Sequence, residues 1–289
     1  NAPVVAATTA SCGSRVMREQ AFDVAVVDEA SQLTEPDALA ALNRAERFVL
    51  VGDHEQLPPV VQAADPGGED GVADEPATDN PLSTSLFERL IEAYPEASVM
   101  LTRQYRMCQR IQAFSSAEFY DGALRPATGA VAGQSLDDLV DLSSLPAALG
   151  DSVSVIDPDG ERVGNTNPVE ADRVAEIVER YIAAGVDPKA IGVIAPFRAQ
   201  VAEISRRVEV TVDTVDRFQG SSKEIIVLSF VATGELEGPL FEDHRRINVA
   251  LTRAKKGLVL VGDRAALSSE PFYERMLAWA DRLISDLQY

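Results

Sequence analysis

Two adjacent carboxylates follow an apolar run in the segment FDVAVVDEASQL, residues 22–33. The run predicts a buried strand over Val24–Asp28, with Glu29 directly after it. In nucleotide hydrolases an acidic residue at the carboxyl end of a strand holds Mg²⁺, and an adjacent glutamate can deprotonate the attacking water. Paired carboxylates also occur at strand ends without a catalytic role, so both interpretations stay open at this point.

A second apolar run ends in a polar turn in FVLVGDHEQLPPVV, residues 48–61. It predicts a strand over Phe48–Gly52, with Asp53 and Gln56 beyond its carboxyl end. From there Gln56 could reach a γ-phosphate or the attacking water, and Asp53 could lie close to the metal. An ordinary strand and turn is the alternative interpretation, but the preceding DEAS segment favours the first.

These residues need a sheet to position them, and short apolar runs alternate with helical patterns along the whole chain. This alternation predicts an α/β fold in which helices flank parallel strands. A crossover helix is expected over Pro168–Ala184, with proline in its first turn and apolar side chains at helical spacing. The remaining buried strands are expected at Val4–Thr8, Ser98–Leu101, Val153–Ile156, Ile191–Ala195, Val210–Thr214, Ile225–Phe230 and Leu258–Gly262.

Two segments break this pattern. Residues 62–81 combine carboxylates, glycines and prolines with no basic residue, so we expect a solvated loop there. Residues 129–150 mix Gly, Ser, Pro and short apolar pieces, and we expect a surface insertion.

Composition excludes several classes of protein. The chain has 289 residues, enough for about two domains. Its 46% of apolar and 25% of charged residues are ordinary for a globular protein. No apolar run is long enough to cross a bilayer and no secretory signal opens the chain, while Cys12 and Cys108 lack metal-site or disulfide spacing. We therefore expect a cytoplasmic protein without a membrane partner.

The net charge of −20 argues against a wholesale basic nucleic-acid binder, but leaves room for a local basic groove. Such a patch is predicted by a cluster that contains no acidic residue, made up of Arg245, Arg246, Arg253, Lys255 and Lys256. A solvated face is the alternative interpretation of its lysines. Arginine far outnumbers lysine, and together with the acidic excess this supports the hypothesis of a salt-adapted protein.

The polar segments occur in an order that resembles the motifs of superfamily 1 helicases. DEASQ and GDHEQLPP resemble motifs II and III, and the AATTASCG segment is similar to motif Ic. The residues of these motifs are most similar to those of the superfamily 1B branch, which contains the nonsense-mediated-decay RNA helicase and the replication helicase/nuclease. The later matches are LTRQYRM (101–107) to motif IV, VIAPFRAQV (193–201) to motif IVa, TVDTVDRFQGSSKEIIVLS (211–229) to motif V and RRINVALTRAKKGLVLVGD (245–263) to motif VI.

This resemblance implies a RecA-like P-loop NTPase fold. Residues 1–95 would be the rear part of the first RecA-like domain, with motifs Ic, II and III, and residues 96–289 the complete second domain. The implied activity is ATP hydrolysis at the interdomain cleft, coupled to movement on single-stranded DNA or RNA in the 5′–3′ direction.

The resemblance also assigns residues of the nucleotide site. Asp28 resembles the Mg²⁺ ligand, Glu29 the general base and Gln56 the γ-phosphate sensor, with Asp53 close to the cofactor. Arg106 and Arg253 resemble the two arginines that neutralise the transferring phosphate, with structural ion pairing as the alternative for each.

In motif V, Gln219 and Gly220 would approach a phosphate. Ser221 and Ser222 stand where the family frequently has a basic residue and a glutamate. No glutamate is therefore available here for the contact that the family makes through it, which would go to the ribose.

Single-stranded nucleic acid would be contacted by hydroxyls and by an apolar surface. The positions that resemble the family's strand-contacting residues are Thr8, Thr9, Pro196, Phe197 and Thr214. Burial of Phe197 in the core is the alternative interpretation for that side chain.

The phosphate-binding loop G-x-x-x-x-G-K-[ST] is missing from the 289 residues. We therefore expect this chain to be the carboxyl-side portion of a longer helicase, inactive without the amino-terminal portion that carries the loop. A non-catalytic nucleic-acid-binding or regulatory protein derived from a helicase is the alternative.

Overall fold

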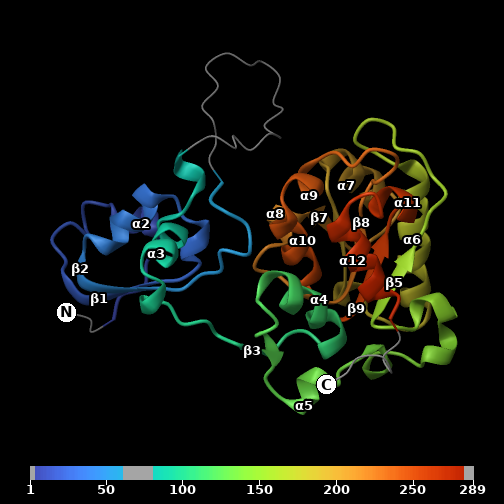
Figure 1. Cartoon of the computed structure of the whole chain (residues 1–289), viewed down its shortest axis with the longest axis horizontal. Helices are drawn as coiled ribbons and strands as arrows, with labels where there is room; N and C mark the ends of the chain where they lie inside the picture. The colour runs from blue at the N-terminus through green and yellow to red at the C-terminus, as the bar shows by residue number, and fades with distance from the viewer. Residues whose placement is uncertain (1–3, 61–80, 283–289) are drawn as a thin grey trace. The chain divides into compact units, whose positions relative to one another are not determined.

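The structure is a computed structural model that describes residues 4–60 and 81–282. The chain divides into two compact units, Asn1–Met100 and Leu101–Tyr289, against an expected boundary after residue 95. Each unit is coloured along the chain in Figure 1. Apart from residue 81, the expected acidic loop at 62–81 lies outside the described residues.

The first unit is built on two parallel strands, β1 (Phe22–Val27) and β2 (Ala45–Leu50). The helix between them, α2 (Glu35–Leu42), begins with a proline and two acidic residues in its first turn, as a helix N-terminus favours. Both predicted strands are confirmed, although each begins and ends earlier than expected. The other helical elements are α1 (Thr9–Cys12), α3 (Leu86–Ala93) and the 3-10 helices η1 (Ala30–Gln32), η2 (Pro81–Ser83) and η3 (Pro95–Ala97).

Burial in this first sheet is lower than the sequence predicts. Val26 is 69% exposed and Phe48 is 50% exposed, because two strands cannot cover both of their own faces. The expected strand Val4–Thr8 is wrong: the segment pairs with no strand of the described chain, and Val4 is 81% exposed.

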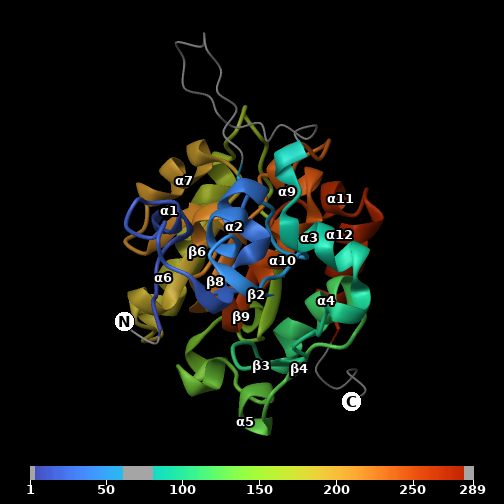
Figure 2. The same cartoon turned by 90° about the vertical axis from the view of Figure 1, so that its left-hand side faces the viewer.

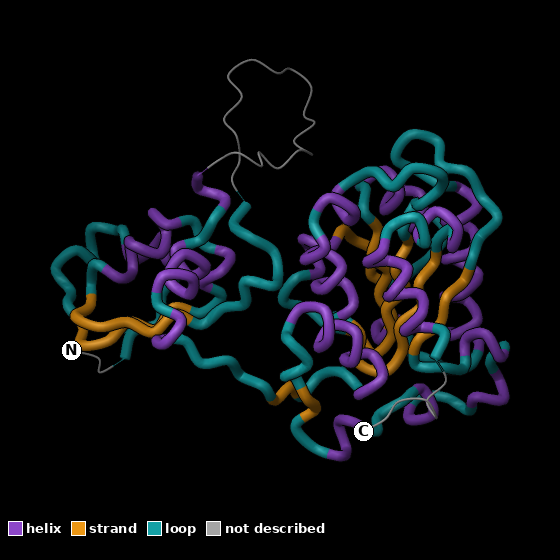
Figure 3. The backbone as a smooth tube through the Cα atoms, viewed as in Figure 1, coloured by secondary structure: helices purple, strands orange, loops and turns teal. Residues whose placement is uncertain are grey.

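The second unit contains a five-stranded, fully parallel sheet in the order β5-β9-β8-β6-β7. The strands of both units are orange in Figure 3. All five predicted strands of this sheet form, two of them over the predicted residues and three with ends that shift by one to four residues. They are β5 (Val153–Ile156), β6 (Ile191–Ala195), β7 (Thr211–Thr214), β8 (Lys223–Ser229) and β9 (Ala254–Val261).

Helices cover both faces of this sheet, as Figures 1 and 2 show together. One side carries α6 (Pro168–Ala183), the predicted crossover helix, and α7 (Arg198–Ser205). The opposite side carries α4 (Gln109–Phe119), α10 (His244–Leu251) and α12 (Pro271–Ala280). The central strands are consequently buried along most of their length, as expected for a sheet covered on both faces. Shorter helices are α5 (Gly129–Ala132), α8 (Val215–Phe218), α9 (Pro239–Glu242) and α11 (Arg264–Leu267).

The segment 129–150 is not the surface insertion that we expected. It forms α5 and the 3-10 helices η4 (Leu136–Asp138), η5 (Leu142–Ser144) and η6 (Ala147–Leu149). Its apolar side chains Leu136, Val140, Leu145 and Leu149 are buried in the main core cluster with α6 and the sheet. Their irregular spacing hid this packing, because short 3-10 turns place apolar side chains inward without a helical period.

The expected strand Ser98–Leu101 is also wrong. These residues form no strand and are exposed, and the short strand β3 (Arg103–Gln104) follows and pairs with β4 (Arg125–Pro126). No helix in the described part of the chain is long and apolar enough to span a membrane.

Candidate functional site

The carboxylates Asp28 and Glu29 follow the last residue of β1, and both are exposed. Glu29 has a left-handed backbone, with φ 53° and ψ 37°, which is uncommon for a residue with a side chain. Its backbone N–H donates to Oδ1 of Asp28 over 3.1 Å. The left-handed turn therefore ends the strand and leaves two neighbouring carboxylates at the carboxyl edge of this sheet.

Gln32 holds the side chain of Glu29. Its Nε2 donates to Oε2 of Glu29 over 2.6 Å, because positions three apart face the same side of the short helix η1. Gln32 is the last residue of the DEASQ segment, and its type alone does not reveal this role.

Ser31 joins the two polar turns of the first unit. The backbone N–H of Asp53 donates to Oγ of Ser31 over 3.1 Å. A Cβ atom at Gly52 would lie only 2.8 Å from the backbone nitrogen of Ser31, so this approach requires glycine. Gln56 in turn donates from Nε2 to Oδ2 of Asp53 over 2.6 Å. The structure therefore brings Asp53 and Gln56 together and ties them to the segment of Asp28 and Glu29.

The donor set of the first unit fits a magnesium ion only in part. No group of three or more His, Cys, Asp or Glu side chains that could hold a metal occurs within residues 4–60 and 81–282. In phosphoryl-transfer sites, however, Mg²⁺ is usually held by one or two carboxylates together with waters and phosphate oxygens. The exposed Asp28 carboxylate suits that role, which stays a prediction.

Gln104 shapes the turn that carries Arg106 in the second unit. Its Oε1 accepts hydrogen bonds from the backbone N–H groups of Arg106 and Met107, each over 2.8 Å, and its Nε2 donates to the carbonyl of Met107 over 2.8 Å. Gln134 donates from Nε2 to the carbonyl of Arg106 over 2.5 Å. The backbone of Arg106 is thus fixed by two amide side chains that sequence reasoning did not single out.

Thr252 connects the two predicted catalytic arginines. Arg106 donates from Nη1 to the carbonyl oxygen of Thr252 over 3.0 Å, and Arg253 donates from Nη2 to its Oγ1 over 2.9 Å. Thr252 is the C-cap of α10, where carbonyl groups carry partial negative charge and attract cations. The structure therefore brings together two arginines that lie far apart in the sequence.

Arg253 is buried, with only 2% of its surface exposed. Its Nε donates to the carbonyl of Val249 over 3.0 Å, and its Nη1 donates to the carbonyl of Ser221 over 3.3 Å. These contacts tie the end of α10 to the loop after α8, so Arg253 also has a structural part in this unit.

The loop after α8 contains Gln219 and Gly220. Gly220 is exposed and left-handed, with φ 79° and no atom within 4 Å of the place of a Cβ. Nε2 of Gln219 is buried without a hydrogen-bond partner. Leaving a buried donor unpaired costs about 1–3 kcal/mol, a cost that an acceptor on a bound ligand would remove.

The residues expected to contact a single strand lie in three different settings. Thr8 caps α1 by accepting from the backbone N–H of Ser11 over 3.4 Å, and Thr9 begins that helix. Thr214 is half-buried at the end of β7. Pro196 and Phe197 are buried at the end of β6, so the burial of Phe197 agrees with the alternative interpretation of that residue.

The basic cluster near α10 is not an unbalanced patch, contrary to our expectation. Arg245 pairs with Asp243 over 3.0 Å, and Arg246 pairs with Asp216 over 2.7 Å. The two lysines are paired as well: Lys255 with Glu224 over 2.8 Å, and Lys256 with Asp138 over 3.4 Å. Three of these four acidic partners lie far from the cluster in sequence, which is why a local count of charges missed them.

Parallel sheets with carboxylates after one strand, a polar turn after its neighbour and arginines able to neutralise a phosphate are typical of nucleotide hydrolases of the α/β class. Residues 82–265 match a family model described as an AAA domain, and residues 1–64 match a second model with the same description. The chain belongs to the superfamily 1B helicases.

Several curated proteins are similar to this chain. The DNA replication ATP-dependent helicase/nuclease of Arabidopsis thaliana is 37% identical over 293 residues, covering 95% of this chain and 21% of that protein. An uncharacterized ATP-dependent helicase of Methanocaldococcus jannaschii is 34% identical over 295 residues, covering 96% of this chain and 42% of that protein. The chain thus spans only a minor part of the length of these relatives.

Among solved structures, that of the PRRSV helicase superposes with a TM-score of 0.41 at 17% identity, over 83% of this chain and 34% of that one. This likeness is too weak to bear on function.

Proposed function

We propose that this chain supplies the carboxylates and arginines of an ATP-dependent helicase that moves along single-stranded nucleic acid. The observation that carries the proposal is the meeting of Arg106 and Arg253 at Thr252. Two guanidinium groups held at one point suit the charge that spreads over the equatorial oxygens of a transferring phosphate.

The first unit would hold Mg²⁺ through Asp28 and activate water through Glu29, whose carboxylate Gln32 orients. Bound Mg²⁺ would neutralise charge on the phosphate oxygens. Gln56 would respond to the γ-phosphate, with Asp53 close to the cofactor, while Gln219 and Gly220 would contact the nucleotide from the second unit.

Single-stranded DNA is the favoured substrate, because the Arabidopsis relative is named as a DNA replication helicase/nuclease. Movement in the 5′–3′ direction follows the family resemblance. The strand contacts would involve Thr8, Thr9, Pro196, Phe197 and Thr214. Both cysteines are free thiols, which supports the cytoplasm, a reducing compartment, as the location of the protein.

The phosphate-binding loop would come from a further segment of polypeptide, since none of the 289 residues forms G-x-x-x-x-G-K-[ST]. The same absence favours a second candidate, a non-catalytic protein that binds nucleic acid or regulates a helicase.

Translating the coding sequence upstream of Asn1 and assaying the full-length product separates the two candidates. ATP hydrolysis that single strands stimulate and Glu29→Gln abolishes supports the helicase. A full-length product that has no such loop and hydrolyses no ATP supports the regulatory protein.

A further inference from the structure

Four fully buried polar side chains connect three segments of the second unit. Asn167 and Glu170 lie at the beginning of α6, Gln200 lies in α7, and Ser229 ends β8; each is 0% exposed. Gln200 accepts from the backbone N–H of Asn167 over 2.9 Å and donates from Nε2 to Oγ of Ser229 over 3.2 Å. Asn167 and Glu170 belong to none of the helicase motifs.

Glu170 is the acceptor at the centre of this network. Its Oε1 accepts hydrogen bonds from the hydroxyl of Ser229 over 2.5 Å and from the backbone N–H of Val231 over 2.9 Å. Val231 has a left-handed backbone with φ 54°, a genuine outlier for a β-branched residue. Such strain persists only where the surroundings enforce it, and Glu170 is the side chain that binds Val231 at this turn.

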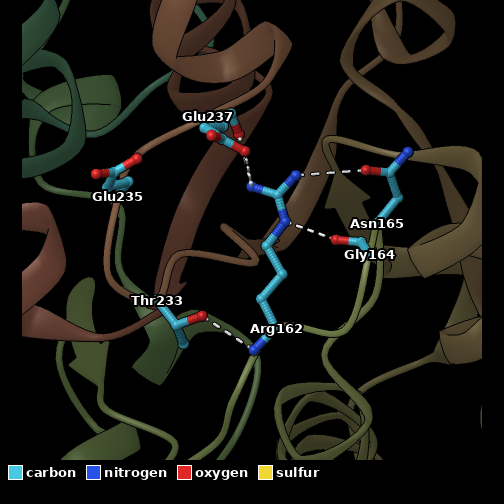
Figure 4. Close-up of a pocket in the computed structure, with 6 residues that line it drawn as sticks. All are labelled: Arg162, Gly164, Asn165, Thr233, Glu235 and Glu237. Carbon is cyan, nitrogen blue, oxygen red and sulfur yellow. Dashed lines mark hydrogen bonds and ion pairs between the residues drawn. The ribbon is translucent and has the colours of Figure 1, made fainter.

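The strained turn begins the loop 231–238, which reaches Phe197. Within this loop, Oγ1 of Thr233 accepts from the backbone N–H of Arg162 over 2.9 Å, and the carbonyl of Glu237 accepts from its Nη1 over 3.2 Å. Arg162, Thr233 and Glu237 line a cavity of about 350 Å³ together with Gly164, Asn165 and Glu235, and Figure 4 shows these six residues. The Arg162 guanidinium lies over the ring of Phe197, 5.0 Å from its centroid. A Cβ at Gly238 would lie 2.4 Å from Cζ of the same ring.

We propose that Glu170 is a positioning residue that keeps Phe197 covered: it fixes the turn at Val231, and through Thr233 the loop 231–238 holds Arg162 on the aromatic ring. A nucleobase and a guanidinium both stack on an aromatic face, so a base can reach this face only when the loop and Arg162 move away. This inference rests on the proposed binding of single strands. The apparent affinity for a strand then depends on the fraction of molecules in which the ring is uncovered.

Glu170 also makes the cover, which consists of Arg162 and the loop 231–238 over Phe197, sensitive to pH. Burial raises its pKa to about 7, against the lowering effect of the hydrogen bonds from Ser229 and from the backbones of Val231 and Phe230. These contacts are uncharged, and the charged groups Arg162, Glu235 and Glu237 lie around the cavity in the loops that the network holds. When the loop 231–238 opens and water reaches Glu170, the pKa of its carboxyl would fall towards the ordinary value. Rising pH therefore favours the uncovered state of Phe197.

The test measures single-stranded DNA binding by the full-length protein with fluorescence anisotropy. Thr233→Val removes the hydrogen bond from the backbone of Arg162, and Ser229→Ala removes the hydroxyl that binds both Glu170 and Gln200. Each variant should tighten binding by about 3- to 10-fold. Ser154→Ala is the matched control, because the buried hydroxyl of Ser154 has no partner, and it should change nothing. In a Phe197→Leu background the gain should disappear. Weaker or unchanged binding by both loosened variants, or a gain that persists without the aromatic ring, overturns the proposal.

If the protein binds no single strand, that result counts against the proposed function but does not test the role of Glu170. A second measurement therefore tests Glu170 without nucleic acid. Hydrogen exchange of the segment 229–234 should quicken from pH 6 to pH 8 beyond the intrinsic chemical increase. In Glu170→Gln, which keeps an acceptor but cannot ionise, only the intrinsic increase should remain. Identical profiles for the two proteins overturn the role of Glu170.

Discussion

Arg106 donates from Nη1 to the backbone carbonyl of Thr252 over 3.0 Å, although 146 residues separate them. The next residue, Arg253, binds the hydroxyl of the same threonine. One residue at the end of α10 therefore contacts both arginines, one through its backbone and one through its side chain. This division makes the two contacts separable by mutation.

Thr252→Val should lower ATP turnover of the full-length protein by about tenfold, since a hydrogen bond to a charged group contributes about 1.5 kcal/mol. The change removes the hydroxyl that Arg253 binds but keeps the carbonyl that Arg106 binds. Steady-state kinetics should show the loss in kcat, with KM for ATP little changed. Thr252→Ser restores a hydroxyl and should recover most of the turnover. Equal losses in both variants would mean that the methyl group, and not the hydroxyl, is what matters.

Arg106→Ala and Arg253→Ala should each reduce turnover by about 10³-fold if both neutralise the transferring phosphate. Their effects on stability should differ. Arg253 is buried and binds the carbonyls of Val249 and Ser221, so its removal should also lower the free energy of unfolding by about 2 kcal/mol or more. Arg106 is only partly buried, and its removal should cost less. Urea unfolding of both variants measures this difference, and equal losses of stability would contradict the structural part assigned to Arg253.

Much of the second unit could be predicted from the sequence, because its central strands β6, β8 and β9 contain continuous apolar runs that are buried on both faces. Val153–Ile156 and Ile191–Ala195 form strands over the predicted residues. The first unit was harder to predict. An apolar run such as Val4–Thr8 predicts a strand wherever it occurs, but a strand also needs a neighbour to pair with, and pairing is not visible in a single segment.

The candidate site could be predicted in its charged residues but not in the neutral residues that hold them. Sequence reasoning singled out Glu29, Arg106 and Arg253 from their motifs. It missed Gln32 and Gln104, whose amides position these residues through contacts three positions away or fewer. Gln32 and Gln104 act only on their neighbours in the chain, and this role appears only when the local turn is known.

Glu29→Gln should abolish ATP turnover of the full-length protein while leaving nucleotide binding intact. The amide keeps the size of the side chain but cannot take a proton from water. Single-turnover hydrolysis and equilibrium binding of a fluorescent nucleotide measure the two properties separately. Asp23→Asn is the control, because Asp23 is an exposed carboxylate within β1, and it should leave both unchanged. Residual turnover above about one part in a hundred would argue that another group activates the water.

Salt should stabilise this chain. Its net charge of −20 causes self-repulsion in the compact state, and about 1 M salt shortens the range of that repulsion to about 3 Å. Urea unfolding at low and at molar KCl should therefore show a higher midpoint in KCl. Equal midpoints would reject the hypothesis of salt adaptation.

Acid should stabilise the second unit through Glu170, in contrast to the usual effect of carboxylates. Burial raises the pKa of Glu170 from 4.5 to about 7 in the folded protein. Between these values the unfolded chain has released the proton and the folded chain has kept it, so the free energy of unfolding falls as pH rises from 4.5 to 7. The free energy of unfolding falls by about 3 kcal/mol in all. This loss begins near pH 4.5 and is nearly complete above pH 7. Unfolding of the wild type and of Glu170→Gln across this range measures it, because the glutamine variant lacks the titrating group. The difference in stability between the two proteins should shift in favour of the variant as pH rises through this range. A constant difference would mean that the pKa of Glu170 is the same in the folded and the unfolded protein.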